Sequence, residues 1–301
     1  MSSLNIHEMR EKQVVEYFYS ARERYQIYLN KKDNKTNNID KPLTNDKAFL
    51  KWRFCNVFRE DDKTTKWIRD NVRTPLGDSW KLLPMMVMCR FTNRIATLEL
   101  LKDAGCVTEW GPDVFYKTLK GVAPVISSAY IIKTPNGLNK IEGIIQIVDS
   151  VYADGREVAH RIVSGVTRLE DAWDSFKRFK FFGGFMAYEI VSDLRHTPIL
   201  DKAPDINTWA CPGPGACRGL SWLVGKNLDC VKYTNTVRAG HANLNAMRKL
   251  LALSNQGEYW PQGWPKWEMR EVEHWLCEYA KYVKIHHLGL RMKQKYVKAI
   301  D

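Results

Sequence analysis

The sequence Cys211-Pro212-Gly213-Pro214-Gly215-Ala216-Cys217-Arg218-Gly219-Leu220 lies between two segments with helical patterns, 185–194 and 218–224. Gly213 and Gly215 can adopt positive φ and carry no Cβ, so the sequence predicts a tight helix-to-helix turn. The first amides of the next helix are unpaired and lie at the positive end of its dipole. We therefore expect Gly213, Gly215 and Arg218 to bind a phosphate group. The alternative is an ordinary loop, since Gly-Pro-Gly is also a common helix breaker.

The composition predicts a folded chain with a polyanionic partner. The 301 residues are 45% hydrophobic and include eleven tryptophans, thirteen tyrosines and eleven phenylalanines, which argues against disorder. The net charge of +12 favours a nucleic acid, with an anionic membrane surface or plain solubility as alternatives. No apolar run approaches the roughly 18 residues needed to span a bilayer, and the N-terminus is polar. We expect an intracellular protein without a membrane partner.

The seven cysteines indicate a reducing compartment, because their number is odd and they are spread through the chain. No Cys-x-x-Cys pair is present, so a zinc ribbon or an iron–sulfur loop is unsupported. We favour the absence of a metal site. The alternative is ligation by Cys277 together with His274, His286 and His287.

Apolar periodicity predicts a mainly α fold with at most a minor β element. The expected helices are 5–29, 54–71, 80–101, 113–119, 141–151, 158–166, 169–179, 241–253 and 268–282, in addition to the two beside the glycine-rich turn. Residues 127–134 are the strand candidate. No long linker appears, so we expect one unit over residues 1–301, or sub-lobes 1–165 and 166–301 with the hairpin 185–224 in the second.

Three regions carry polar or aromatic groups that admit two interpretations. The polar side of 54–71 is either a binding surface or a solvated face with local ion pairs. Glu189, Asp193 and Arg195 lie in an otherwise apolar helix and are either functional or structural, the structural alternative being a salt bridge of Asp193 with Arg195 or Arg218. The loop 260–267, with three tryptophans, either stacks unpaired bases or covers the core.

Several blocks together resemble the α-glutamyl/putrescinyl thymine pyrophosphorylases of bacteriophages and the related helical domains of phage 5-hydroxymethyluracil DNA kinases. These blocks are Asn56-Val57-Phe58-Arg59-Glu60-x-Asp62, Ala129-Tyr130-Ile131, Phe185-Met186-Ala187-Tyr188 with Asp193-Leu194-Arg195, Gly213-Pro214-Gly215-x-x-Arg218-Gly219-Leu220, and Leu276-Cys277-Glu278-Tyr279-x-Lys281-Tyr282. They extend from about residue 15 to residue 296. The resemblance implies a derivative of the helix-hairpin-helix DNA glycosylase fold, in which a Pro-Gly-x-Gly turn grips the DNA backbone.

The activity implied by the resemblance is modification of a DNA base after replication. A kinase first forms 5-pyrophosphoryloxymethyluracil in the DNA, and a transferase then lets an amine or amino acid displace pyrophosphate at the exocyclic methylene carbon. The expected partners are double-stranded phage DNA and the small amine donor, in the cytoplasm of the infected bacterial host. No cofactor is certain; Mg²⁺ stays open because it often accompanies pyrophosphate, although no ligand cluster is visible.

This chemistry needs a carboxylate that keeps the attacking amine neutral and cations that stabilise the leaving pyrophosphate. The candidate catalytic carboxylates are Glu278, Asp193 and Asp62, in that order. The candidate substrate and pyrophosphate contacts are Asn56, Arg59, Arg90, Arg94, Arg195, Lys281 and Tyr282, and the DNA contacts are Gly213, Gly215 and Arg218.

Two alternative functions stay open on the same fold. A DNA glycosylase or lyase would need an activating Asp about twenty residues after the glycine-rich turn, a spacing taken from the family, and 232–238 contains no acid while Asp229 comes too early. A non-catalytic, DNA-binding helical partner of a 5-hydroxymethyluracil DNA kinase is the other alternative. The chain lacks a Gly-x-x-x-x-Gly-Lys-[Ser/Thr] loop, so we do not expect it to be the kinase itself.

Overall fold

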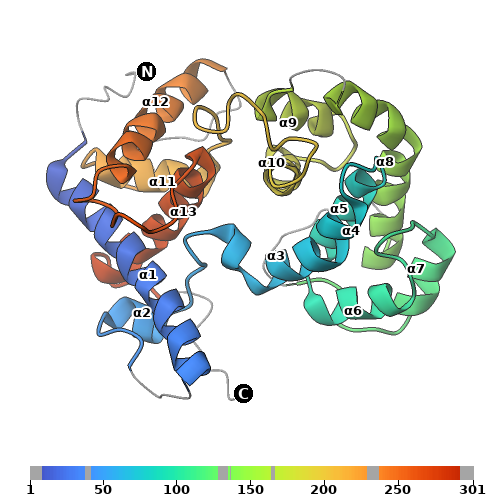
Figure 1. Cartoon of the computed structure of the whole chain (residues 1–301), viewed down its shortest axis with the longest axis horizontal. Helices are drawn as coiled ribbons and strands as arrows, with labels where there is room; N and C mark the ends of the chain where they lie inside the picture. The colour runs from blue at the N-terminus through green and yellow to red at the C-terminus, as the bar shows by residue number, and fades with distance from the viewer. Residues whose placement is uncertain are drawn as a thin grey trace. The chain divides into compact units, whose positions relative to one another are not determined.

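A computed structural model of the protein describes residues 9–37, 42–127, 135, 137–163, 167–228 and 237–291. Over these residues the regular structure is helical and no strand occurs, which confirms the mainly α class (Figure 1). The strand candidate 127–134 lies outside the described residues except for Ser127. The chain forms two compact units, a terminal unit of residues 1–61 and 207–301 and a central unit of residues 62–206. These boundaries differ from the expected sub-lobes because the terminal unit joins both ends of the chain.

The terminal unit is built around its last helix. Its elements are α1 (Glu11–Asn37), α2 (Lys47–Lys51), η2 (Arg59–Asp61), α11 (Pro214–Leu223), α12 (Val237–Ser254) and α13 (Met269–His286). The Tyr17 hydroxyl of α1 donates to the Val272 carbonyl of α13 at 3.2 Å, and the Trp275 indole of α13 donates to the Tyr17 carbonyl at 3.2 Å. Because all three residues are fully buried, these reciprocal bonds fix α1 against α13 inside an apolar core.

The aromatic loop 260–267 covers one side of this core. Trp260 and Trp267 are buried, and the Trp264 ring lies 4.7 Å from the Tyr25 ring of α1, centroid to centroid. The Trp267 ring lies 5.7 Å from that of Phe18. Edge-on and tilted ring packing of this kind stabilises a core. Of the two interpretations of this loop, the structure therefore supports the core cover.

The central unit packs around one helix that is buried along its whole length. Its elements are α3 (Lys63–Ile68), η3 (Arg69–Arg73), α4 (Thr74–Leu76), α5 (Leu82–Thr92), α6 (Ile95–Asp103), α7 (Pro112–Leu119), α8 (Lys140–Val163), α9 (Leu169–Lys177) and α10 (Gly184–Leu194). Every residue of α5 is buried, and α5 contacts α8 and α10. A helix that is apolar on all sides is expected at the centre of a domain.

Helix boundaries differ from the expectation at three places. The expected helix 80–101 is two helices, because Asn93 ends α5 with a left-handed φ of 46°. The expected helix 54–71 is broken as well: α3 begins only after Asp62, whose backbone is extended with ψ 139°. In contrast, the segments 141–151 and 158–166 belong largely to the single helix α8.

The glycine-rich segment does not form the expected tight turn. Helix α10 ends at Leu194 and α11 begins at Pro214, so residues 195–213 separate the two helices, which belong to different units. Gly213 has a φ of −73° as the residue before α11, and Gly215 lies inside the first turn of that helix. The predicted turn with positive φ angles is therefore wrong, because Pro214 already starts the helix and its fixed φ suits that position.

The glycines of α11 instead allow two helices to come close together. A Cβ at Gly219 would lie 2.4 Å from the Leu276 carbonyl oxygen of α13, and one at Gly215 would lie 2.7 Å from Cys277 Sγ. The first neighbour is backbone and cannot move aside without displacing α13. Gly219 thus sets the distance between α11 and α13, which is a packing role.

Gly219→Ala is expected to lower the free energy of unfolding by about 1–3 kcal/mol, because the added methyl group forces α11 away from α13. Gly155→Ala is the matched control, since Gly155 lies inside α8 and its Cβ would meet its nearest atom, in the Trp80 ring, at an ordinary 3.4 Å. There the gain in helix propensity makes the change neutral or stabilising. Urea unfolding followed by circular dichroism measures both; equal effects of the two substitutions would contradict the packing role of Gly219.

Candidate functional site

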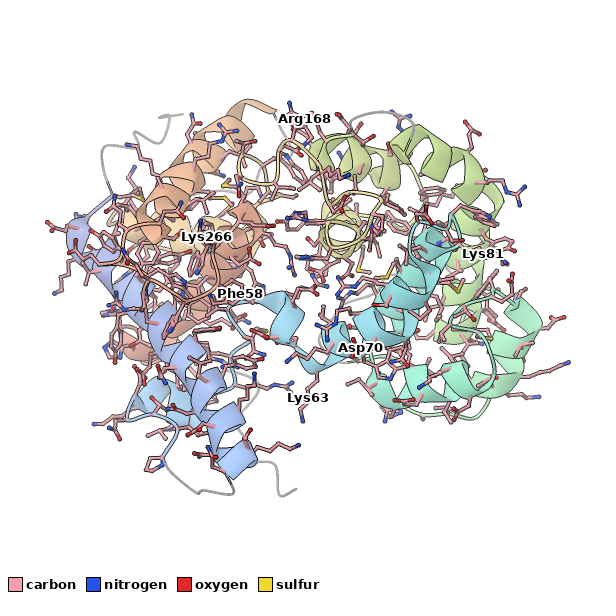
Figure 2. The ribbon with its side chains drawn as sticks, in the orientation of Figure 1. Phe58, Lys63, Asp70, Lys81, Arg168 and Lys266 are labelled. Atoms are coloured by element: carbon pink, nitrogen blue, oxygen red, sulfur yellow. The ribbon has the colours of Figure 1, made fainter. Side chains whose placement is uncertain are left out.

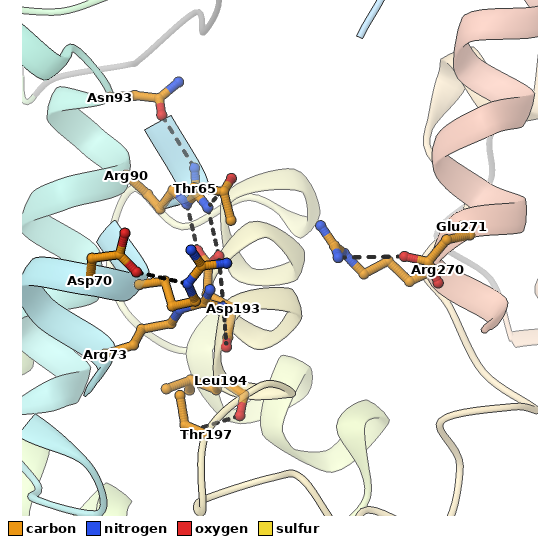
Figure 3. Close-up of polar contacts among 11 residues, drawn as sticks. Thr65, Asp70, Arg73, Arg90, Asn93, Asp193, Leu194, Thr197, Arg270 and Glu271 are labelled. Carbon is orange, nitrogen blue, oxygen red and sulfur yellow. Dashed lines mark hydrogen bonds and ion pairs between the residues drawn. The ribbon is translucent and has the colours of Figure 1, made fainter. Parts of the chain in front are cut away.

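A buried ion-pair network lies in the central unit around Asp193 of α10 (Figure 3). Arg90 of α5 donates through Nε to Asp193 Oδ2 at 2.5 Å and through Nη2 to Oδ1 at 2.6 Å. Arg73 of η3 donates to the Asp193 carbonyl at 3.3 Å, and its Nη1 lies 3.9 Å from Oδ1. Thr65 Oγ1 accepts a further bond from Arg90 Nη2 at 3.1 Å. This set of four residues is called the Asp193 network.

The Asp193 network places two guanidinium groups on one carboxylate in the interior. The Asp193 side chain has no exposed surface, and those of Arg73 and Arg90 are each 2% exposed. A bidentate pair is the strong form of an Arg–carboxylate contact, and a buried charge requires such partners. Asp193 therefore does form a salt bridge, as one of the two interpretations held, but with Arg90 and Arg73. Its carboxylate holds these two cations in place.

A second buried carboxylate, Glu278 of α13, organises the terminal unit. The Cys55 backbone N–H donates to Glu278 Oε2 at 3.1 Å, and Lys281 Nζ pairs with Oε1. His274, one turn earlier on α13, places its Nε2 3.0 Å from the Asn56 carbonyl oxygen. The four residues Cys55, His274, Glu278 and Lys281 are called the Glu278 cluster. It ties the segment before η2 to α13, which are two of the blocks that carry the family resemblance.

The electrostatics keep Glu278 ionised. Burial opposes ionisation, but Lys281, His274 and the Cys55 N–H outweigh it and lower the pKa of the Glu278 carboxyl below its usual value. Burial also disfavours the Lys281 ammonium, yet the adjacent Glu278 carboxylate raises the pKa of Lys281. The pair is thus a carboxylate and an ammonium at neutral pH. A carboxylate with a lowered pKa is a weak base, so Glu278 is better suited to orient groups than to take a proton.

Two other residues of the terminal unit that were predicted to contact the substrate, Asn56 and Tyr282, make hydrogen bonds within that unit. Asn56 accepts from Arg24 through Oδ1 at 2.5 Å and donates to the Asp61 carbonyl at 3.0 Å. The Tyr282 hydroxyl donates to Asp46 Oδ2 at 2.9 Å. Arg59 is buried. Of the candidate cations here, Arg218 on α11 is partly exposed.

The remaining central-unit candidates are partly exposed. Asp62 precedes α3 as its N-cap, without a hydrogen bond from its side chain to the helix. Arg94 donates to Thr97 Oγ1 at 3.2 Å, and Arg195 donates to the Asp201 carbonyl at 3.4 Å. Lys63 is exposed, and its side chain points away from the ribbon of α3 (Figure 2). These positions are accessible to a ligand, whereas Arg90 and Asp193 are not.

The structure brings some of the predicted residues together and assigns the rest to separate units. The central unit contains Asp62, Arg90, Arg94, Asp193 and Arg195, and the terminal unit contains Asn56, Arg59, Gly213, Gly215, Arg218, Glu278, Lys281 and Tyr282. Sequence reasoning assigned no site role to Arg73 or Thr65 and named His274 only as an alternative metal ligand. The spacing of His274 four residues before Glu278 was a usable signal, since such residues share a helix face. Nothing in the sequence marked Arg73 as a partner of Asp193.

An acidic cavity of about 460 Å³ lies in the terminal unit beside α1. It is lined by Tyr19, Glu23, Gln26, Asn30, Pro42, Leu43, Thr44, Asn45 and Asp46. Among the described residues that line it, Glu23 and Asp46 are the charged groups and none is a lysine or arginine. Glu23 accepts a hydrogen bond from Thr44, while Asp46 holds Tyr282 and caps α2. The size falls within the usual range for small-molecule sites, and the charge favours a cation.

Comparison with known proteins identifies the class of this chain. Residues 11–292 match the family described as 5-hmdU DNA kinase, helical domain. The chain is 24% identical over 273 residues to a "5-hmdU DNA kinase" of Bacillus phage SP10, an alignment that covers 80% of this chain and 41% of that protein. No solved structure matches. These two matches place this mainly helical protein in a class related to phage DNA kinases. The chain belongs to the 5-hmdU DNA kinase helical-domain family.

The family match confirms some of the expectations drawn from the sequence and leaves others as predictions. The relationship to the helical domains of phage 5-hydroxymethyluracil DNA kinases is confirmed, and the specific pyrophosphorylase assignment stays a prediction. The mainly helical class is confirmed, while the glycosylase-like arrangement within it also stays a prediction. Among the helices in the described part of the chain, none combines the length and the apolar character needed to cross a membrane.

Asp193→Asn is expected to lower the free energy of unfolding by about 3–5 kcal/mol, because two buried guanidinium groups lose their counter-charge. Thr65→Val removes one neutral acceptor from the same network and is expected to cost about 1 kcal/mol. Urea unfolding at pH 7 compares the two. A loss for Asp193→Asn no larger than that for Thr65→Val would show that the carboxylate does not hold the network together.

Glu278→Gln is expected to lower the free energy of unfolding by about 1–3 kcal/mol at pH 7. A lowered pKa in the folded state means that the stabilisation is fully present above the unfolded value of about 4.3 and is lost as pH falls through the folded pKa. The difference between wild type and variant should therefore shrink below pH of about 4. Glu258→Gln, at an exposed position, is the control. A difference that is the same at all pH values would contradict the lowered pKa of Glu278.

Proposed function

We propose that the protein is a phage DNA base-modifying transferase. It joins a small amine or amino acid to 5-pyrophosphoryloxymethyluracil in double-stranded DNA and releases pyrophosphate. The proposal is supported chiefly by the match of residues 11–292 to a family named for 5-hmdU DNA kinase. Residues 1–301 contain no Gly-x-x-x-x-Gly-Lys-[Ser/Thr] loop.

The net charge of +12 supports DNA as the partner, because clustered cations gain from counterion release on a polyanion. Arg218, on the first half of α11, is the DNA contact that the geometry favours in the terminal unit, since it is partly exposed. Gly215 acts by letting α11 lie close to α13, and the Gly213 N–H donates to Glu273 Oε1 at 3.3 Å, so both glycines contribute to DNA binding only through the position of Arg218. The base must leave the stack for its methylene carbon to be attacked. Such a reaction takes place in the cytoplasm of an infected host cell.

The acidic cavity beside α1 supports an amine donor. Its two carboxylates, Glu23 and Asp46, attract an ammonium group, and the described lining residues include no cation that opposes it. Asp46 is hydrogen-bonded to Tyr282, so the cavity is linked to α13, the helix that carries Glu278. The cavity would store the donor in its protonated form until the proton is removed for attack.

The proposed reaction is a substitution at carbon. The amine nitrogen forms a bond to the exocyclic methylene carbon, the carbon–oxygen bond breaks, and pyrophosphate leaves with the electron pair. One proton of the attacking nitrogen must pass to a base. Among the three candidate carboxylates, Asp62 is partly exposed, whereas Asp193 and Glu278 are buried and hold cations. We assign the proton acceptor to Asp62 and positioning roles to Asp193 and Glu278.

The leaving pyrophosphate needs cations that a ligand can reach. Arg94 and Arg195 are partly exposed, so a ligand can reach them, and guanidinium groups bind phosphate strongly. Arg90 and Lys281 contact carboxylates, so they act by orienting the surrounding structure. The roles of Asn56, Arg59 and Tyr282 are likewise structural support. Mg²⁺ would add charge to the leaving group, as is common for pyrophosphate.

The test is mass spectrometry of nucleosides after incubation with DNA that carries 5-pyrophosphoryloxymethyluracil and a mixture of amines and amino acids. We expect an amine-bearing thymidine and one released pyrophosphate per modified base. Asp62→Asn is expected to lower the rate by about 10²–10⁴-fold, the usual contribution of a general base, and to keep the fold because Asn is an equally good N-cap. Asp70→Asn, at an exposed residue of η3, is the matched control and should keep the wild-type rate.

Other products would overturn the proposal. Free base or an abasic site would identify a glycosylase or lyase. Unchanged nucleosides, with the DNA still bound, would favour a non-catalytic helical partner of a kinase. The chain spans 41% of the length of the curated phage kinase that it matches.

A further inference from the structure

Two histidines at the end of α13 lie beside a glutamate of α1, outside both charge networks. The ligand atoms of Glu16, His286 and His287 all lie within 4.8 Å of one another. His287 Nε2 is 2.6 Å from Glu16 Oε1. Glu16 comes from the first helix of the terminal unit and the histidines from its last, so only the folded unit assembles the group.

The three side chains are held by contacts that leave ligand atoms on one side. Glu16 Oε2 accepts from the Tyr279 hydroxyl at 2.8 Å, which leaves Oε1 directed at His287. The His286 ring stacks on Tyr282 with centroids 5.3 Å apart and planes at 13°, and the His287 ring packs against that of Trp222 at 5.1 Å. A carboxylate oriented by a second hydrogen bond and imidazoles oriented by packing are the usual support of a metal ligand set.

We propose that Glu16, His286 and His287 bind one divalent transition-metal ion of the zinc class. Two imidazole nitrogens and one carboxylate oxygen form a ligand set that suits Zn²⁺, Co²⁺ or Ni²⁺, whereas Mg²⁺ prefers oxygen ligands throughout. Bonds of about 2.0–2.2 Å in a tetrahedron put ligand atoms roughly 3.3 Å apart. The His287–Glu16 separation of 2.6 Å is shorter than this value and the other separations are at most 4.8 Å, so small side-chain rotations would close the site. The fourth position faces solvent because both histidines are exposed.

The ion would join the two ends of the terminal unit at the surface. Glu16 precedes by one residue the Tyr17 that bonds Val272, while His286 is the last residue of α13. A metal bridge there acts on the same helix pair as the buried Tyr17 contacts but from the outside. This proposal is independent of the proposed transferase activity.

The test is titration of the untagged full-length protein with Co²⁺, followed by visible absorption, and with Zn²⁺ in competition. We expect saturation at one ion per chain, a spectrum typical of four-coordinate cobalt, and displacement by Zn²⁺ but not by Mg²⁺ at the same concentration. His286→Ala and Glu16→Gln are each expected to weaken binding by about tenfold or more. His196→Gln and Glu11→Gln, which remove the same groups elsewhere, should leave it unchanged.

Circular dichroism of each variant without metal shows whether the fold is kept, and the exposed His286 makes its substitution the safest of the four. Absence of saturable binding would overturn the site. So would binding that neither His286→Ala nor Glu16→Gln weakens, or an affinity for Mg²⁺ equal to that for Zn²⁺.

Discussion

The packing of α1 against α13 is the contact on which the terminal unit depends. It joins residues 255 positions apart in the chain through a bond between Tyr17 and Val272, and a bond from Trp275 returns to Tyr17. Once α13 is fixed, the absence of a side chain at Gly219 lets α11 approach it, and the Glu278 cluster fastens the segment before η2 to its other side. One helix therefore positions every block of the terminal unit that carries the family resemblance.

The two buried carboxylates neutralise charge in different ways. Asp193 receives two guanidinium groups, from η3 and α5, and lies four residues after Glu189, another buried acid of the central unit. Glu278 receives one ammonium and one backbone N–H. The acidic cavity of the terminal unit favours a cation, whereas the partly exposed Arg94 of the central unit favours an anion.

The sequence was sufficient for the helices whose apolar periodicity is uninterrupted. Helices α7, α9 and α13 begin and end close to the predicted residues, since each is limited by its own pattern. The sequence did not predict a helix end that depends on the backbone conformation of a single residue, as at Asn93 between α5 and α6. The glycines of α11 were misread because a glycine that permits close packing looks the same in sequence as one that permits a turn. Only the position of Leu276 distinguishes the two.

The sequence identified individual residues of the candidate site but not the residues with which they pair. Helix polarity singled out Asp193 as unusual, because an acid among apolar neighbours must be paired when buried, whereas Glu278 was named from the family resemblance. Their partners lie 120 residues away for Arg73 and 223 residues away for Cys55, and no local pattern can connect positions so distant. The charge networks are properties of the tertiary fold, whereas the acids at their centres are visible in the sequence.

The division of the chain, in which residues 62–206 interrupt the terminal unit, has a consequence for synthesis in the cell. Helix α1 leaves the ribosome long before α13 exists, and at about 5–20 residues per second the interval amounts to roughly 10–45 s. During this time the aromatic face that holds Tyr17 and Phe18 has no helix to cover it. The central unit, by contrast, is continuous in sequence and folds as soon as it emerges. Chaperone demand during translation therefore falls on the first helix of the protein.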